Sequence, residues 1–156
     1  MNEKAHKLKA SSLPKDQLVQ EMNLLSKRLN TLVEEDSLKQ LENGKVVGLI
    51  GGEHSAPYGF LKALSKKHKE FGILHVDAHF DLRKAYEGYT YSHASIMYNV
   101  MNDIEEAKKI VSFGIRDFCK AEFDISQALV KKGQSLVYFD RDLYLSLIHI
   151  SEPTRR

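Results

Sequence analysis

The sequence has few of the residues that mark secreted, membrane-bound or nucleic-acid-binding proteins. Its single cysteine, Cys119, excludes an intrachain disulfide and lies in no zinc-binding spacing of Cys and His. No stretch approaches the roughly 18 apolar residues that cross a bilayer, and the N-terminal residues contain no apolar core of a signal peptide. The 23 basic and 21 acidic side chains nearly balance and are scattered. We therefore expect a cytoplasmic chain with neither a nucleic-acid nor a membrane partner.

Apolar runs and turn residues predict one domain in which helices and strands alternate. The expected helices lie at about residues 15–33, from residue 57 onward, near 94–108 and near 119–131, and the expected strands at 45–50, 71–76, 110–115 and 135–139. Strands separated by helices favour parallel pairing, because a parallel connection requires a crossover. The predicted fold class is therefore α/β with a mainly parallel sheet.

The first expected helix carries one apolar stripe. Its members recur at steps of four and three residues, namely Leu18, Met22, Leu25, Leu29 and Leu32. The stripe fits a helix that covers a sheet, which we favour, or an oligomer seam.

Acidic and imidazole side chains follow two of the expected strands. Asp77, His79 and Asp81 come directly after the second strand, and their period of two would place them on one side of an extended backbone. His54 follows the first strand, just past a Gly-Gly pair. Because ligands collect at the carboxyl ends of parallel strands, two neighbouring strands would bring all four side chains into one crevice.

Two aspartates at the end of an apolar strand require a compensating cation, because unpaired carboxylates are costly to bury. Carboxylates combined with imidazoles suit Mn²⁺ or a similar divalent ion. In the alternative interpretation, Asp81 pairs with Arg83 or a lysine, and His54 and His79 make ordinary polar contacts. We favour metal binding because the four residues occur together at strand ends.

Two neighbours of these candidates are expected to support them. His75 is in phase with the triplet but one step deeper in the strand, which favours a buried supporting role over ligation. Glu53 precedes His54, and a hydrogen bond accepted by its carboxylate could orient that loop.

Three short motifs resemble the consecutive signatures of the ureohydrolases, the family of arginase, agmatinase and formimidoylglutamase. They are Gly-Gly-Glu-His-Ser at 51–55, Asp-Ala-His-Phe-Asp at 77–81 and Ser-His-Ala-Ser at 92–95. The match spans about residues 44–118, and the second motif is highly specific. The resemblance implies an arginase-like three-layer α-β-α fold, truncated after about half of the domain, with residues 1–143 as its N-terminal part.

The resemblance also implies a chemistry. Two Mn²⁺ ions would be held by His54, Asp77, His79 and Asp81, with Asp77 bridging both ions and two aspartates of a later strand completing the centre. A hydroxide between the ions would attack the guanidinium carbon and release urea and an amine. His93 and Asp81 are the implied catalytic residues. His93 would shuttle protons or, alternatively, form a supporting hydrogen bond.

The expected substrate is a small guanidino compound, agmatine first. Arginases have an asparagine that helps to grip the α-carboxylate at the position of Arg83 in this chain, and an arginine there resembles agmatinase-type sequences. Arginine, formimidoylglutamate and guanidinobutyrate remain open as substrates. The resemblance implies polyamine biosynthesis and a trimer or hexamer. A non-catalytic homologue and a mononuclear metal-binding module are the alternatives.

The C-terminal residues raise a separate question. Asp140 and Asp142 have the spacing of the later aspartate pair, but they follow Asp77 too closely, and Tyr138 replaces the usual serine. We favour the interpretation that the true pair lies beyond this chain. Residues 144–156 fit no element and resemble a translated sequencing adapter, which predicts a non-native tail. We expect the 156 residues by themselves to be inactive.

Overall fold

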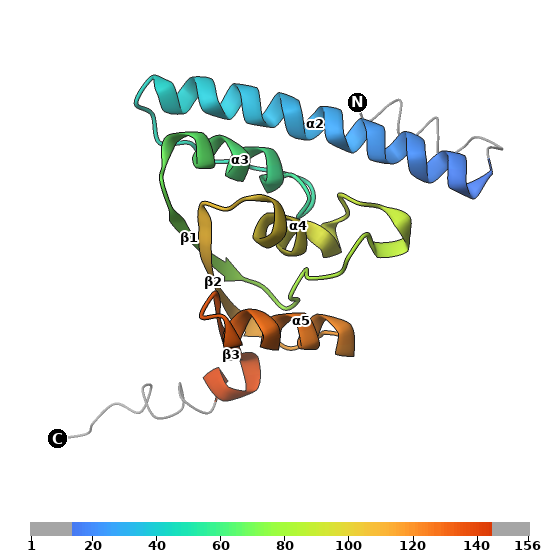
Figure 1. Ribbon diagram of the computed structural model, residues 1–156, viewed down its shortest axis with the longest axis vertical. Helices are drawn as coiled ribbons and strands as arrows, with labels where there is room; N and C mark the ends of the chain where they lie inside the picture. The colour runs from blue at the N-terminus through green and yellow to red at the C-terminus, as the bar shows by residue number, and fades with distance from the viewer. Residues whose placement is uncertain (1–13, 145–156) are drawn as a thin grey trace.

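The computed structural model describes residues 14–144, which form helices around a small parallel sheet (Figure 1). The elements in chain order are α2 (Lys15–Glu42), α3 (Pro57–Lys67), β1 (Phe71–Val76), η1 (Tyr86–Gly88), η2 (His93–Ser95), α4 (Ile96–Asp103), β2 (Ala107–Ile115), α5 (Lys120–Lys131) and β3 (Ser135–Phe139). The sheet order is β1-β2-β3, and both pairings are parallel. The predicted α/β class is confirmed. No helix in residues 14–144 is long and apolar enough to cross a membrane.

Helices α3, α4 and α5 lie on one face of this sheet. That face carries the partly or fully buried side chains Ile73, Ile110 and Val137, which contact the core formed with α3 and α4. The opposite face exposes apolar side chains, among them Leu74, Val76, Leu136 and Tyr138. Of the three layers predicted, the described residues thus form the sheet and one helical layer (Figure 1).

The segment at residues 45–50 is not the predicted strand. It pairs with no strand in the described part of the chain, and the side chains of Val46 and Ile50 are fully exposed. An apolar run adopts strand structure only where a neighbouring strand accepts its hydrogen bonds. The expected parallel pairing of the strands at 45–50 and 71–76 is therefore wrong for this structure, because β1 pairs only with β2 among residues 14–144.

Helix α2 is longer than predicted and packs on another helix rather than on the sheet. The helix continues past residue 33 to Glu42, and Asn43 caps it before Gly44 with its φ of 72°. Along the predicted stripe Leu25 is buried, whereas Leu32 is exposed. The helix packs along α3 (Figure 1), so the sheet-covering interpretation is wrong.

The crossing of α2 and α3 depends on Gly59. A Cβ atom added at this glycine would lie 2.2 Å from the carbonyl oxygen of Asn30. Beside the crossing, Glu34 of α2 forms ion pairs with Lys62 and Lys66 of α3, at 3.6 Å and 2.6 Å. The crossing fixes the start of α3, which directly follows the loop that carries His54.

The remaining boundaries lie close to the predicted ones. The strands at 71–76 and 135–139 and the helix near 119–131 are confirmed, the last to within one residue. The helix predicted at 94–108 already ends at Asp103, and β2 starts at Ala107 rather than at residue 110. The exposed Lys108 and Lys109 obscured the start of this strand, because its apolar run begins after them. The predicted non-native tail is residues 144–156; Tyr144 ends the helical stretch at residues 140–144, and residues 145–156 lie outside the described residues.

Tyr58 links α3 to α4 through its hydroxyl, which donates a hydrogen bond of 2.8 Å to Asp103 Oδ2. Burial and this hydrogen bond raise the pKa of Tyr58, so the hydroxyl keeps its proton throughout the neutral range. Tyr58→Phe should lower the free energy of unfolding by about 1–2 kcal/mol, measured by denaturant titration. The control Tyr98→Phe removes a hydroxyl that bonds nothing in residues 14–144 and should change little. Equal stability of the two variants would contradict the prediction.

Candidate metal centre

The chain turns as soon as β1 ends, and this turn shapes the candidate centre. The amide of Asp77 still donates to Phe113 O at 3.0 Å, but residues 77–79 bend away from the strand direction. Asp81 has a positive φ of 53°, and its carbonyl accepts the amides of Met97 and Tyr98 at 3.1 Å and 3.2 Å. The predicted extended triplet is therefore wrong. The turn brings Asp77 and Asp81 together, and the start of α4 holds Asp81 in the left-handed conformation.

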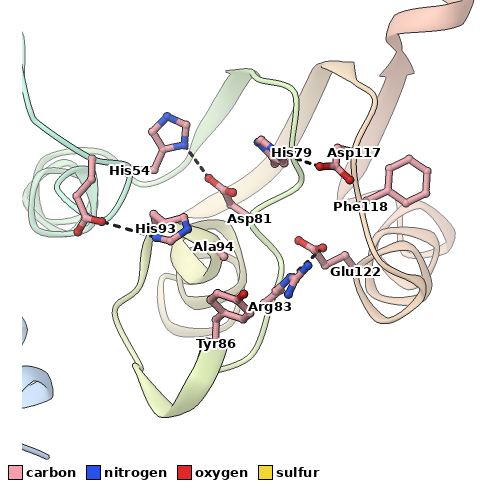
Figure 2. Close-up of a pocket in the computed structure, with 11 residues that line it drawn as sticks. His54, His79, Asp81, Arg83, Tyr86, His93, Ala94, Asp117, Phe118 and Glu122 are labelled. Atoms are coloured by element: carbon pink, nitrogen blue, oxygen red, sulfur yellow. Dashed lines mark hydrogen bonds and ion pairs between the residues drawn. The ribbon is translucent and has the colours of Figure 1, made fainter. Parts of the chain in front are cut away.

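The carboxylates of Asp77 and Asp81 converge on one imidazole nitrogen. His54 Nδ1 lies 3.0 Å from Asp77 Oδ2 and 2.9 Å from Asp81 Oδ2. The two aspartate side chains are only 8% and 5% exposed, whereas His54 is 57% exposed. His54 comes from the turn before α3 and not from a strand end, but it reaches the crevice that the sequence predicted (Figure 2).

His79 faces the other oxygen of Asp77. Its Nδ1 lies 3.4 Å from Asp77 Oδ1, and its Nε2 lies 3.5 Å from Asp117 Oδ2. The two oxygens of Asp77 thus face different imidazoles, as a carboxylate shared by two metal ions would require. His79 lies outside the tightest group of donors, which consists of His54, His75, Asp77 and Asp81 with ligand atoms within 4.8 Å of one another.

His75 is buried beneath this group. Its Nε2 lies 3.4 Å from Asp77 Oδ2, yet neither ring nitrogen has a hydrogen-bond partner in the described part of the chain. Burial lowers the pKa of His75, which favours the neutral imidazole. A neutral ring next to Asp77 can donate to the carboxylate or offer a lone pair to a cation.

Burial and short contacts shift the protonation of the three central groups. Burial raises the pKa of Asp81, and the hydrogen bond from His54 only partly opposes this. Burial alone would also raise the pKa of Asp77, but the amide of His79 and the charge of His54 outweigh it, so this pKa is lowered. The hydrogen bond to Asp81 raises the pKa of His54 despite its partial burial. The arrangement therefore favours a positive charge between the carboxylates.

The protein supplies little of that charge itself. No Lys or Arg in residues 14–144 forms an ion pair with Asp77 or Asp81. The alternative in which Asp81 pairs with Arg83 is wrong, because Arg83 Nε lies 3.3 Å from Glu122 Oε2 instead. Converging buried carboxylates, imidazole nitrogens and a ring without hydrogen bonds form a donor set that fits a divalent cation such as Mn²⁺.

An open cavity of about 420 Å³ adjoins these residues and is large enough for a small guanidino compound. Its lining includes Glu53, His54, His79, Asp81, Arg83, Tyr86, His93, Asp117 and Glu122 (Figure 2).

His93 stands at the edge of this cavity, at the start of η2. Its side chain is 61% exposed, and its Nδ1 lies 3.8 Å from Glu53 Oε2. Glu53 also accepts a hydrogen bond from the Ser55 hydroxyl, which ties it to its own loop as the predicted orienting role requires. An exposed imidazole beside a carboxylate is suited to exchanging protons with solvent.

Three polar residues of this cavity, Tyr86, Asp117 and Glu122, were not predicted from the sequence. Asp117 follows β2 as Asp77 follows β1, so its position after a predicted strand was a usable signal. Glu122 occupies the first turn of α5, and only the fold brings it next to Arg83. Gly114, with a φ of 89°, sits where the pairing of β2 and β3 shifts register. Beyond it, the amides of Arg116 and Asp117 both donate to Ala78 O. This bulge places Asp117 beside His79.

Asp140 and Asp142 lie apart from the centre. They belong to a helical stretch at residues 140–144 and line a separate cavity with Arg116, Phe118 and Phe139. Neither belongs to the donor group described above.

The geometry agrees with what comparisons with known proteins show. The model described as "Arginase family" matches residues 7–142. Agmatinase of Bacillus anthracis is 38% identical over 109 residues, which cover 70% of this chain and 36% of that protein. N(1)-aminopropylagmatine ureohydrolase of Thermus thermophilus is 33% identical over 112 residues, covering 72% and 36%.

Solved structures give the same result. Arginase from Medicago truncatula superposes with a TM-score of 0.64 at 30% identity, covering 80% of this chain and 38% of that one. A putative agmatinase from Clostridium difficile gives 0.60 at 25% identity, covering 83% and 41%. The chain therefore belongs to the arginase family of ureohydrolases. It spans about a third of the length of the curated relatives that it matches.

Proposed function

We propose that the protein hydrolyses a guanidino compound, agmatine first, at a centre of two Mn²⁺ ions held by His54, Asp77, His79 and Asp81. The observation that carries this proposal is the placement of Asp77. One of its oxygens converges with Asp81 on His54, and the other faces His79. A cytoplasmic trimer or hexamer is the assembly that we propose with it.

Agmatine is preferred over arginine for two reasons. Arg83 replaces the asparagine that arginases use to grip the α-carboxylate, so that this contact is absent. Relatives that match over more than two thirds of the chain are named for agmatine or an aminopropyl derivative of it. Both substrates lack the carboxylate of arginine.

Each residue of the proposed site has a separate role in the reaction. When bound, the two cations would supply a water molecule of lowered pKa as the nucleophile for the guanidinium carbon. Asp77 and Asp81 hold the positive charge in place, and the buried His75 supports Asp77 from below. His93 faces both the cavity and solvent. In this position it can donate a proton to the amine nitrogen as the C–N bond breaks.

The full-length gene product loaded with Mn²⁺ should release urea, with the highest kcat/KM for agmatine among agmatine, arginine and guanidinobutyrate. His93→Asn should lower kcat by about 10²–10⁴-fold, the range for loss of a general acid. His68→Asn, at an exposed histidine after α3, should leave kcat unchanged. Absence of urea from every guanidino compound would overturn the proposal.

A single-metal site is the second candidate function. It is favoured by one observation, the close grouping of His54, His75, Asp77 and Asp81 without His79. The metal content of the full-length gene product separates the two candidates, because the binuclear centre predicts two ions per chain and the single site predicts one.

A further inference from the structure

The loop at residues 83–95 follows the turn that carries Asp77, His79 and Asp81, and it contains His93 near its end. Hydrogen bonds join the two ends of this loop. The amide of Arg83 donates to Ala94 O at 2.9 Å, and the amide of Tyr86 donates to the Ser95 hydroxyl at 3.3 Å. Arg83, Tyr86 and His93 all line the cavity of the candidate centre. The loop thus joins three pocket side chains through its own backbone.

The outer part of the loop is fastened to two helices. Asn23 of α2 donates to Gly88 O at 3.0 Å and accepts the amide of Thr90 at 2.9 Å. Asn99 of α4 donates to Thr90 O at 2.8 Å. With its outer part held, the remaining freedom of the loop lies in the side chains that face the cavity.

Glu122 of α5 holds the inner side of the loop. It is only 4% exposed, and its Oε1 accepts the amide of Leu82 at 3.3 Å. Its Oε2 accepts Arg83 Nε at 3.3 Å and the amide of Cys119 at 3.1 Å. A buried carboxylate with three donors has a fixed orientation, and it fixes the guanidinium of Arg83 in turn.

The guanidinium of Arg83 lies against the ring of Tyr86, and this ring lies beside the imidazole of His93. Arg83 Cζ lies 4.6 Å from the centroid of the Tyr86 ring, in cation–π geometry. The ring of Tyr86 meets the His93 imidazole edge to face, with centroids 6.2 Å apart and an interplanar angle of 79°. Figure 2 shows this succession from Glu122 through Arg83 and Tyr86 toward His93.

We propose that Glu122, Arg83 and Tyr86 form a brace that positions the His93 imidazole in the reaction pocket. This inference rests on the proposed function, in which His93 transfers protons. His93 requires such support because it is largely exposed, and its Nδ1 lies 3.8 Å from Glu53 Oε2. The brace residues are positioning residues, since they act on the reaction through His93.

The first test measures kinetics of the full-length gene product. Arg83→Lys keeps the charge but loses the Nε donor, and Tyr86→Leu removes the ring. Each should lower kcat about tenfold or more, with KM for agmatine and the manganese content nearly unchanged, because a misplaced catalytic group slows the chemical step. Tyr86→Phe retains the ring and should keep kcat within about twofold of wild type. The control Lys120→Gln breaks an exposed ion pair with Asp124 on the same helix and should have no effect.

The second test does not depend on turnover. In the metal-free protein, NMR signals of the His93 ring should shift or broaden in Arg83→Lys and Tyr86→Leu, while those of the exposed His68 stay in place. Wild-type protein that releases no urea would defeat the proposed function, and the NMR spectra would then still decide whether the brace positions His93. Unmoved His93 signals, or an active enzyme whose kcat is equal in Tyr86→Leu and Lys120→Gln, would overturn the brace.

Discussion

Asp77→Asn should lower the Mn²⁺ affinity of the full-length gene product by more than about a hundredfold, because even residues that only orient metal ligands change affinity by about 10–100-fold. One oxygen of Asp77 faces His54 and the other faces His79. An asparagine retains the shape but has no negative charge, and one of its two terminal atoms is an NH₂ group that cannot ligate a cation. One of the two proposed metal positions would therefore lose a ligand, and the other would keep only a neutral amide oxygen in place of a carboxylate oxygen.

Isothermal titration with Mn²⁺ and metal analysis after gel filtration would measure this loss. The control Asp36→Asn changes a carboxylate on the exposed side of α2 and should bind Mn²⁺ as the wild type does. His79→Asn should lose one ion per chain, since His79 faces only one oxygen of Asp77. Retention of two tightly bound ions in Asp77→Asn would contradict the placement of Asp77 between them.

The candidate ligands could be found in the sequence because their signal is local. Three polar residues follow an apolar run, and this pattern can be recognised without knowing which strands pair with the run. The strand at 71–76 has the predicted bounds. The geometry of Asp77, His79 and Asp81 could not be predicted in this way, because it depends on residues outside the triplet. Asp81 takes a positive φ because the amides of Met97 and Tyr98 in α4 bind its carbonyl, and these residues lie 16 and 17 positions further along the chain.

Contacts between distant segments account for the other differences. The run at 45–50 has a strand-like composition, but composition does not reveal whether a neighbouring strand is present. The apolar stripe on α2 does not indicate whether the helix packs on a sheet or on another helix. In the sequence, Glu122 is only an acidic residue near the start of a predicted helix, and the packing of α5 beside the loop at residues 83–95 shows that it binds Arg83.

Gly59→Ala should destabilise the protein by about 3 kcal/mol, or about 10 °C in Tm, because overpacking against a rigid neighbour is costly. The added Cβ would meet the Asn30 carbonyl oxygen at 2.2 Å and the Glu34 amide nitrogen at 3.0 Å, both backbone atoms of α2. These backbone atoms can move away from the added Cβ atom only if one helix shifts. The free energy that this shift costs exceeds the roughly 1 kcal/mol by which alanine stabilises a helix relative to glycine.

The same shift should reach the metal centre, because α3 begins three residues after His54. Gly59→Ala protein that still folds should therefore bind Mn²⁺ more weakly than wild type, by about tenfold, the lower end of the range for residues that orient ligands. Thermal melts measure the first effect and isothermal titration the second. The matched control is Gly48→Ala, whose Cβ would point into open space and which should leave both quantities within error of wild type. A Gly59→Ala variant as stable as this control would show that α2 and α3 do not need their close approach to hold His54 beside the aspartates.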